Sequence, residues 1–356
     1  MISANLETLG WDDWFEEQAN TSCEQASSVA RVAAVDRDQL LLINDSGVFR
    51  AKLSGKYMHD SVSSSELPSV GDWVCVDRSD ADQFGMVRGV LKRKTSLRRK
   101  AVGESVDYQM IAANVDVVFI VQSCHYDFNP KRLERYLVMV LDGGAAPHIL
   151  LTKTDLVGPE VVSAQLAQIR SVGIEAPVLM ISNITREGID ELRRVLLPRK
   201  THCFVGSSGV GKSTIINGLL GRAMLETKGV SATGEGRHTT VRRELIVLEN
   251  GSMVIDNPGM REFGIPGAGG GIEASYSDIV ALSPQCHFRD CTHTNEPGCA
   301  VLKALESGEI NAEHYENFLK LRSESEYYQA SYAEKRQKDK EFGRFIKSAK
   351  KDLKDD

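Results

Sequence analysis

The sequence predicts a multidomain protein with a small β-barrel, an α/β domain built on a parallel sheet, and a C-terminal helical domain. Five short apolar segments separated by turn residues lie between positions 29 and 91, as in small barrels. From position 116 onward, strand-like and helix-like runs alternate, which is typical of a parallel sheet covered on both faces. We place the boundaries at 1–28 for an N-terminal extension, then 29–100, 101–272 and 273–356.

The barrel segments are bounded by turn-forming residues and span 29–35, 40–43, 47–53, 72–76 and 85–90. Their number fits an OB barrel and an SH3-like barrel equally well. Residues 92–100 follow with six positive charges and no negative ones. We interpret this segment as a linker that contacts phosphates, although a solvated linker would have the same composition.

In the α/β domain the sequence predicts alternating strands and helices, and in the C-terminal region it predicts helices. The expected strands are 117–122, 148–151, 177–182, 203–205, 241–248 and 254–256, and the expected helices are 130–141, 161–172, 188–196 and 213–220. A run rich in glycine at 267–271 predicts a flexible hinge. Helices are expected at 300–307 and 312–328, and the tail 331–356 is interpreted as an exposed helix.

Composition favours a cytoplasmic globular protein. The chain has 356 residues, of which 42% are apolar and 26% charged, an ordinary balance for globular domains. The N-terminus is acidic and no apolar run reaches the length of a membrane span. Cys23, Cys75, Cys124 and Cys203 are scattered and do not form a secreted disulfide framework. The net charge of −6 means that any RNA contact must come from local patches.

The strongest motif is GxxxxGKS, between a strand-like and a helix-like run. Its residues are Gly206, Ser207, Ser208, Gly209, Val210, Gly211, Lys212 and Ser213, with Thr214 directly after. Glycines let successive backbone N–H groups point at phosphate oxygens in front of a helix N-terminus. Lys212 would reach the β- and γ-phosphates and Ser213 would offer its hydroxyl to Mg²⁺. The motif predicts a nucleoside triphosphate site.

A second motif favours guanine as the base. Thr152, Lys153 and Asp155 follow the strand 148–151. The Asp155 carboxylate can accept from both N1–H and the 2-amino group of guanine, whereas adenine offers neither donor there. The Lys153 stem can cover the base, and Ser182, which closes the next strand, is a candidate for a second base-side loop.

Two further segments predict the Mg²⁺ and γ-phosphate contacts. Asp256 and Gly259 form a DxxG motif after an apolar strand; Asp256 would hold Mg²⁺ through water and the Gly259 amide would sense the γ-phosphate. Thr239 and Thr240 lie between this motif and the phosphate loop. One of the two threonines would close over Mg²⁺ when the third phosphate is present, and the sequence does not choose between them.

The motifs occur in an unusual order, with the base loop before the phosphate loop, so a Ras-like domain is circularly permuted here. The chain resembles the circularly permuted ribosome-associated GTPases that assist maturation of the bacterial small (30S) subunit. The resemblance rests on the segments 113–116, 206–214, 236–240 and 256–259 and on a C-terminal cysteine cluster. The chain departs from the family pattern at Asn257, usually threonine, and at Thr152, often asparagine. The substitution at 152 would loosen the base pocket.

The cysteine cluster predicts a structural zinc site. Cys286, Cys291, His293 and Cys299 lie within fourteen residues, and three thiolates with one imidazole make a closed tetrahedral Cys₃His site. The family's own cysteine–histidine motif, which continues through Glu296 to Ala300, matches here. His287 is expected at the surface or behind the ligands.

The resemblance implies an OB barrel and hydrolysis of GTP to GDP, stimulated by the 30S subunit and its 16S rRNA, by a protein that we expect to be monomeric. Lys212 and Mg²⁺ would neutralise the phosphates. Met260 stands where many Ras-like enzymes carry a water-orienting glutamine, so we name His238 as the candidate helper. The alternatives are a GTP-gated rRNA-binding module whose hydrolysis only resets binding, and a P-loop small-molecule kinase.

Overall fold

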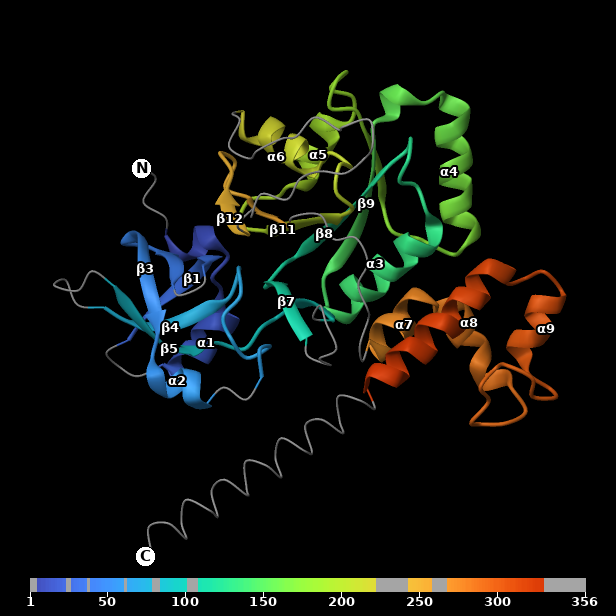
Figure 1. Ribbon diagram of the computed structural model, residues 1–356, viewed down its shortest axis with the longest axis horizontal. Coiled ribbons are helices and arrows are strands. Elements are labelled where there is room, and N and C mark those ends of the chain that lie inside the picture. The colour runs from blue at the N-terminus through green and yellow to red at the C-terminus, as the bar shows by residue number, and fades with distance from the viewer. Residues whose placement is uncertain are drawn as a thin grey trace, which may run out of the picture.

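The computed structural model describes residues 5–23, 27–36, 39–60, 63–78, 84–100, 108–221, 243–257 and 268–329. A β-barrel and a C-terminal helical lobe lie to either side of an α/β domain (Figure 1). No helix among these residues is long and apolar enough to cross a membrane.

The N-terminal barrel has the topology of an OB fold. Its strands are β1 (Ser28–Val35), β2 (Leu40–Asn44), β3 (Gly47–Leu53), β4 (Trp73–Asp77) and β5 (Gly85–Val90), and the helix α2 (Gly55–Asp60) joins β3 to β4. Antiparallel pairs link β1 to β2, β2 to β3, β4 to β5 and β1 to β4, and β3 lies parallel to β5. The closed ring confirms the OB barrel that the resemblance implied.

The N-terminal extension covers one end of the barrel. The short helix η1 (Leu6–Leu9) precedes α1 (Asp13–Ser22), whose first turn is capped by the Asp12 side chain. The Trp11 and Phe15 rings pack on Trp73, with centroids 4.7 and 5.8 Å from it. Cys23, just after α1, forms a disulfide with Cys75 in β4, so two of the four scattered cysteines are paired.

The α/β domain is built on the strand order β10-β9-β8-β11-β13-β12. Its strands are β8 (Val117–Ser123), β9 (Ala146–Thr152), β10 (Val178–Ile181), β11 (Thr201–Gly206), β12 (Glu244–Val247) and β13 (Met253–Asp256). All neighbours are parallel except β12 and β13. A single antiparallel pairing, Ala34 with Glu244, joins β1 of the barrel to β12.

Helices cover both faces of this sheet. Successive residues of each strand point to opposite sides, and the apolar residues on each side are buried under helices. The helices are α3 (Pro130–Asp142), η2 (Thr154–Leu156), α4 (Pro159–Ser171), α5 (Ile189–Val195) and α6 (Lys212–Leu220). Val118 and Ile120 share a core with α3 and α4, whereas Phe119 and Val121 share one with α5 and α6. The parallel, doubly covered sheet was predicted from the alternation of elements.

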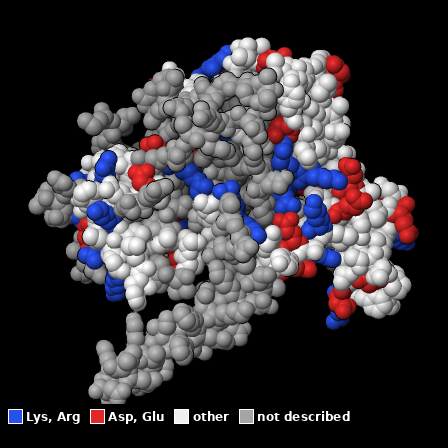
Figure 2. Space-filling model, viewed as in Figure 1, with Lys and Arg blue, Asp and Glu red and all other residues white. Residues whose placement is uncertain are grey.

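The expectation of a basic linker at 92–100 is wrong for its second half. Ser96–Lys100 forms β6, which pairs antiparallel with β7 (Tyr108–Ala113). Arg93 and Arg98 are held by Asp72 and Asp142 at 2.8 and 3.0 Å. On the face shown in Figure 2, Lys and Arg side chains form a band across the middle of the molecule.

The C-terminal lobe corrects the expectation of a glycine hinge. It contains α7 (Gly269–Ser275), α8 (Ser277–Leu282), η3 (Ser283–Gln285), α9 (Ala300–Glu306) and a helix over 312–329. Gly269 to Gly271 form the first turn of α7. A Cβ on Gly271 would lie 2.2 Å from the Val138 carbonyl oxygen of α3, so glycine is needed for close helix packing rather than for flexibility.

Candidate nucleotide and metal sites

The loop between β11 and α6 has the backbone shape of a phosphate-binding loop. Gly206, Gly209 and Gly211 have φ values of 146°, 80° and 102°, which side-chain-bearing residues rarely adopt. The buried Lys212 donates from Nζ to the carbonyl oxygens of Gly206 and Ser207, at 2.8 and 2.7 Å. The loop therefore curls around the lysine ammonium and leaves its N–H groups at the N-terminus of α6 for an anion.

Lys212 and Asp256 form the charged centre of this site. Burial lowers the pKa of Lys212 to about 8, although Asp256 and Asp127 oppose that shift. Burial also raises the pKa of Asp256, at the end of β13. A bound phosphate would stabilise the ammonium form of Lys212, because an opposite charge nearby favours the charged state.

The donors that Mg²⁺ requires are present beside Lys212. The Ser213 hydroxyl lies 3.4 Å from Asp256 Oδ2. The other oxygen of that carboxylate, Oδ1, is buried and has no hydrogen-bond partner among the described residues. A hydroxyl and a carboxylate oxygen beside a phosphate loop are ligands that suit this cation, so the residues fit Mg²⁺.

The base loop lies against the phosphate loop. Thr152 ends β9, is fully buried, and donates its hydroxyl to the Val210 carbonyl oxygen at 2.6 Å. Asp155 is exposed and accepts a 2.6 Å hydrogen bond from the Ser182 hydroxyl, which follows β10. Three segments separated in sequence thus meet at the carboxyl edge of the sheet. The Thr152 hydroxyl links the base loop to the phosphate loop.

The remaining predicted residues divide into two groups. Ser208, Gly209 and Thr214 are exposed around the phosphate loop, and Lys153 is half-buried with φ of 58°. His238, Thr239, Thr240, Gly259 and Met260 lie outside the described residues.

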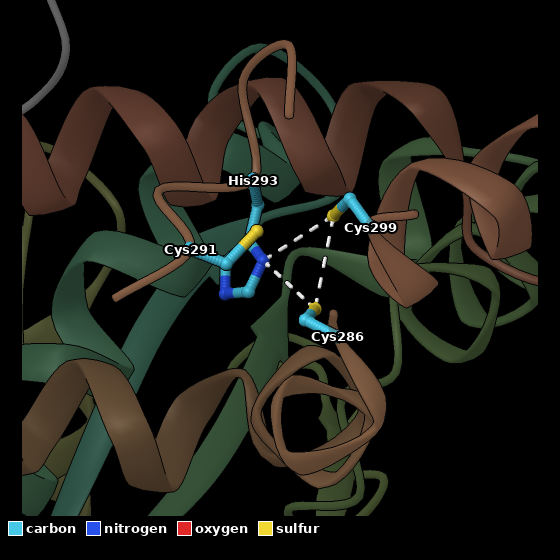
Figure 3. Close-up of side chains that lie close together, drawn as sticks. All are labelled: Cys286, Cys291, His293 and Cys299. Carbon is cyan, nitrogen blue, oxygen red and sulfur yellow. Dashed lines mark hydrogen bonds between the residues drawn. The ribbon is translucent and has the colours of Figure 1, made fainter. Parts of the chain in front are cut away.

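The four predicted zinc ligands converge in the C-terminal lobe (Figure 3). Their ligand atoms all lie within 4.8 Å of one another. His293 Nδ1 is 3.6 Å from Cys286 Sγ and 3.5 Å from Cys299 Sγ. His287 is exposed and stands outside this group. Three thiols and one ring nitrogen at this spacing suit tetrahedral zinc with no open position.

The surrounding residues fix the orientation of these ligands. His293 Nε2 lies 3.1 Å from the Ser283 hydroxyl, while Nδ1 faces the Cys286 and Cys299 sulfur atoms. The Tyr315 hydroxyl donates to the His293 carbonyl oxygen. Glu296 accepts from the backbone N–H groups of Thr292 and Thr294 at 2.8 and 2.9 Å and so closes the loop between the ligands.

Comparison with known proteins agrees with this arrangement. A model of the RsgA GTPase family matches residues 90–266. The small ribosomal subunit biogenesis GTPase RsgA 2 of Listeria monocytogenes is 43% identical over 324 residues, which are 91% of this chain and 90% of the relative. The chain belongs to the RsgA GTPase family. A relative from Opitutus terrae, also named small ribosomal subunit biogenesis GTPase RsgA, is 37% identical over 90% of each chain.

Two solved structures share this fold. YjeQ from Thermotoga maritima matches with a TM-score of 0.61 and 25% identity, covering 83% of this chain and 97% of that one. YloQ, described as a circularly permuted GTPase, matches with a TM-score of 0.59 and 22% identity over 86% and 97% of the two chains. The permuted order expected from the motifs is therefore shown for this fold.

Asn257, which departs from the RsgA pattern, is buried and structural. Its side-chain oxygen accepts from Arg243 Nε at 3.1 Å, and Arg243 donates to the Met110 carbonyl oxygen at 2.9 Å. Asn257 therefore links the end of β13 to β7. A threonine hydroxyl at this position would be too short to reach as far as the asparagine amide does.

The loop between β8 and α3 is a further part of this region that no sequence motif marks. The buried Gln122 amide accepts from Asn129 N at 2.9 Å and donates to Asn129 O at 3.2 Å. Asn129 also caps α3 by accepting from Arg132 N at 3.0 Å. The Asn-Pro pair at 129–130 signals the helix start, but nothing local shows that the loop lies beside the phosphate site.

Proposed function

We propose that this chain binds GTP with Mg²⁺ and hydrolyses it to GDP and phosphate, acting as a cytoplasmic monomer in maturation of the small ribosomal subunit. The observation that carries the proposal is the contact between loops. Thr152 binds Val210 of the phosphate loop, and Ser182 orients Asp155. A guanine ring on Asp155 would therefore place its phosphates on the loop around Lys212.

Guanine selectivity follows from the Asp155 carboxylate. Its exposed oxygen atoms can accept two donors from guanine, and the Ser182 hydroxyl fixes the carboxylate in place. Adenine would leave the charge without a donor on that edge. The ordered carboxylate thus favours the guanosine nucleotide.

Hydrolysis would depend on positioning and charge neutralisation. Lys212 would move from the carbonyl oxygens of Gly206 and Ser207 to the β- and γ-phosphates. Ser213 would hold Mg²⁺ directly and Asp256 would hold it through water, and the ion would supply positive charge against the phosphates. We propose His238 as the residue that helps orient the attacking water, since Met260 cannot do so.

The partner is proposed from the relatives, which are named small ribosomal subunit biogenesis GTPases. The band of Lys and Arg side chains in Figure 2 offers a surface for the phosphates of 16S rRNA. Binding of the 30S subunit would then stimulate the slow hydrolysis of the free protein, with His238 as the helper.

Phosphate release tests the nucleotide and the partner together. We expect release from GTP, little from ATP, and a rate that rises when purified 30S subunits are added. Asp155→Asn should weaken GTP binding by about a hundredfold, because the charged acceptor for two donors is lost. Glu160→Gln, an exposed carboxylate change on the adjacent helix α4, should leave binding unchanged. Equal use of ATP and GTP by the wild type would refute the proposal.

The metal is proposed as one structural zinc ion held by Cys286, Cys291, His293 and Cys299. Elemental analysis of the purified protein should give one zinc per chain, and Cys299→Ser should lose it. GTP affinity should change little in that variant, because the metal lies in a separate lobe. A protein without stoichiometric zinc whose C-terminal lobe is nonetheless folded would contradict the assignment.

A further inference from the structure

A disulfide ties the N-terminal helix α1 to the barrel. Cys23 directly follows α1, Cys75 lies in β4, and the two positions are 52 residues apart in sequence. The five other cysteines are free thiols, and three of them belong to the Cys₃His cluster. Disulfides seldom persist in a reducing cytoplasm, and those that do are usually redox-sensing or catalytic. The Cys23–Cys75 pair is therefore a candidate redox site.

One sulfur of this pair can be reached by an external thiol. Cys23 is partly exposed, whereas Cys75 is only 2% exposed. An attacking thiolate would therefore bond to the Cys23 sulfur, and Cys75 would leave as a thiolate and take up a proton. The second thiol of a dithiol would then attack the mixed disulfide and release Cys23 as a thiol. In the balanced step the dithiol gives two electrons and two protons to the protein and becomes a disulfide itself.

The disulfide holds an end of α1 that has little other attachment. Phe15 is the only buried residue of this ten-residue helix, and it packs on Trp73 near the helix start. Every residue from 16 to 22 is exposed or partly exposed. A helix of this length is marginal on its own in water. Reduction of the disulfide therefore removes the link that keeps the C-terminal half of α1 on the barrel.

The start of the same helix covers the ammonium group of Lys94. Asp12, which caps α1, forms an ion pair with Lys94. Lys94 Nζ also lies 5.3 Å from the centre of the Trp14 ring and 4.7 Å from that of Phe15, which is within the range of cation–π contacts. Lys94 belongs to the basic segment 92–100. The docked helix thus occupies one of the positive charges that this segment offers to an anion.

We propose that Cys23 and Cys75 form a reversible redox site, which a cytoplasmic dithiol reduces, and that reduction loosens α1 and releases Lys94 from its contacts with that helix. Oxidised glutathione, a disulfide, would reverse the step by the same exchange. The inference rests on the proposed cytoplasmic location and requires nothing of the nucleotide site.

Thiol counting tests the redox site directly. The folded, oxidised full-length protein is treated with thioredoxin, its reductase and NADPH, then alkylated with iodoacetamide and analysed by peptide mass spectrometry. We expect alkylation of Cys23 and Cys75 to rise together from nearly none to nearly complete, and oxidised glutathione to reverse it. A bond that stays intact in the folded protein would overturn the proposal. Two thiols that oxidised glutathione cannot join would overturn it as well.

Hydrogen exchange measures the attachment of α1. The amides of residues 17–22 should exchange about tenfold faster in the reduced protein, because local opening is easier without the cross-link. Cys23→Ser should exchange at this faster rate with or without the reductant. Cys124→Ala removes a free thiol and keeps the disulfide, so it should respond to the reductant as the wild type does. Equal rates in the oxidised and reduced wild type would show that the disulfide does not hold the helix.

Amine labelling reports on the release of Lys94. An N-hydroxysuccinimide ester should label Lys94 about threefold faster after reduction, since a partly exposed ion pair contributes little more than this. Lys92, which is exposed in the same segment, should be labelled at the same rate in both states. Asp12→Asn should speed labelling of Lys94 in the oxidised protein without breaking the disulfide. Labelling of Lys94 that ignores the redox state would refute its release.

The outcomes separate this inference from the proposed function. If cell fractionation places the protein outside the cytoplasm, the proposed location is wrong, whatever the disulfide does in the purified protein. If the protein is cytoplasmic and hydrolyses GTP but the dithiol does not reduce the disulfide, only the redox inference is wrong.

Discussion

The two junctions that attach the outer domains to the α/β domain use opposite chemistry. At the barrel junction a single buried cation, Arg31, is surrounded by neutral acceptors. At the junction with the C-terminal lobe, the buried His314 lies between two carboxylates, Glu134 and Asp278. Both are buried charges, yet only the second is balanced by opposite charge in direct contact.

Arg31 joins five segments that are distant in sequence. Its Nε donates to Gly71 O at 3.2 Å, Nη1 contacts Leu9 O and the Met253 sulfur, and Nη2 donates to Asn114 O at 3.1 Å and Thr201 Oγ1 at 2.8 Å. All five N–H groups of the guanidinium thus have a partner. Burial lowers the pKa of Arg31 to about 10, against the opposing effects of Asp116 and Asp72, so the side chain stays charged at neutral pH.

The lobe junction is a network of ionisable groups between α3 and the helix over 312–329. His314 Nδ1 contacts Glu134 Oε1 at 2.5 Å and Nε2 contacts Asp278 Oδ1 at 3.2 Å. The Asn317 amide donates to the second oxygen of Glu134 at 2.7 Å and to the Tyr276 hydroxyl at 3.0 Å. The stability of this network depends on whether His314 is protonated. The contacts of Arg31 do not, because its partners are carbonyl oxygens, a hydroxyl and a thioether sulfur. The comparison predicts one junction that is insensitive to pH and one that is sensitive.

The largest effect is expected at the barrel junction. Arg31→Met should lower the free energy of unfolding by about 3 kcal/mol, because each buried acceptor left unpaired costs roughly 1–3 kcal/mol. The effect should be the same at pH 6.5 and pH 9. Urea denaturation at both values measures it.

Arg50→Met is the control for this substitution. Arg50 is exposed on β3, so its replacement should change stability by less than about 0.5 kcal/mol. The two arginines differ in burial rather than in charge. Similar losses for the two variants would mean that the acceptor cage around Arg31 contributes nothing.

The lobe junction should lose stability as the pH rises. Burial alone would lower the pKa of His314, but hydrogen bonds to Asp278 and Glu134 raise it to about 9. The charged histidine therefore stabilises the fold fully below the unfolded-state pKa of about 6.5, and this contribution disappears as the pH rises through 9. The slope should approach about −1.4 kcal/mol per pH unit between these values.

His314→Gln isolates this contribution. Glutamine cannot titrate, so the difference in unfolding free energy between wild type and variant should shrink from pH 6.5 to pH 9.5. Titration of all other groups is common to both proteins and cancels in the difference. A constant difference across this range would show that His314 is neutral in the folded protein.

The comparison also shows what the sequence could reveal. The four residues of the Cys₃His cluster lie within fourteen residues, and the barrel strands are short apolar segments bounded by turn residues, so both were predictable from short segments. Arg31 lies in the apolar strand β1 and finds its acceptors as many as 222 residues away, a distance at which local pattern carries no information.

The wrong predictions of a basic linker and of a glycine hinge have the same physical cause. The basic segment at 96–100 is a strand because β7 pairs with it, and the glycines at 269–271 are helical because α3 packs against them. In both cases tertiary contact outweighed local propensity.

The smallest effect is expected at the ion pair between Arg135 and Glu324, which lies at the lobe junction but is not expected to follow the pH dependence of His314. Arg135 on α3 makes two 2.8 Å hydrogen bonds to the Glu324 carboxylate, with side chains 21% and 20% exposed. A double-mutant cycle with Arg135→Met and Glu324→Gln should give a coupling of about 1 kcal/mol, since bidentate pairs are stronger than ordinary surface pairs. This coupling should stay constant between pH 6.5 and 9, while the His314 contribution falls. The same cycle on the exposed pair Arg193 and Asp190 should give nearly zero. A coupling at Arg135 that fell in parallel with His314 would mean that the whole junction opens as one unit when the histidine loses its proton.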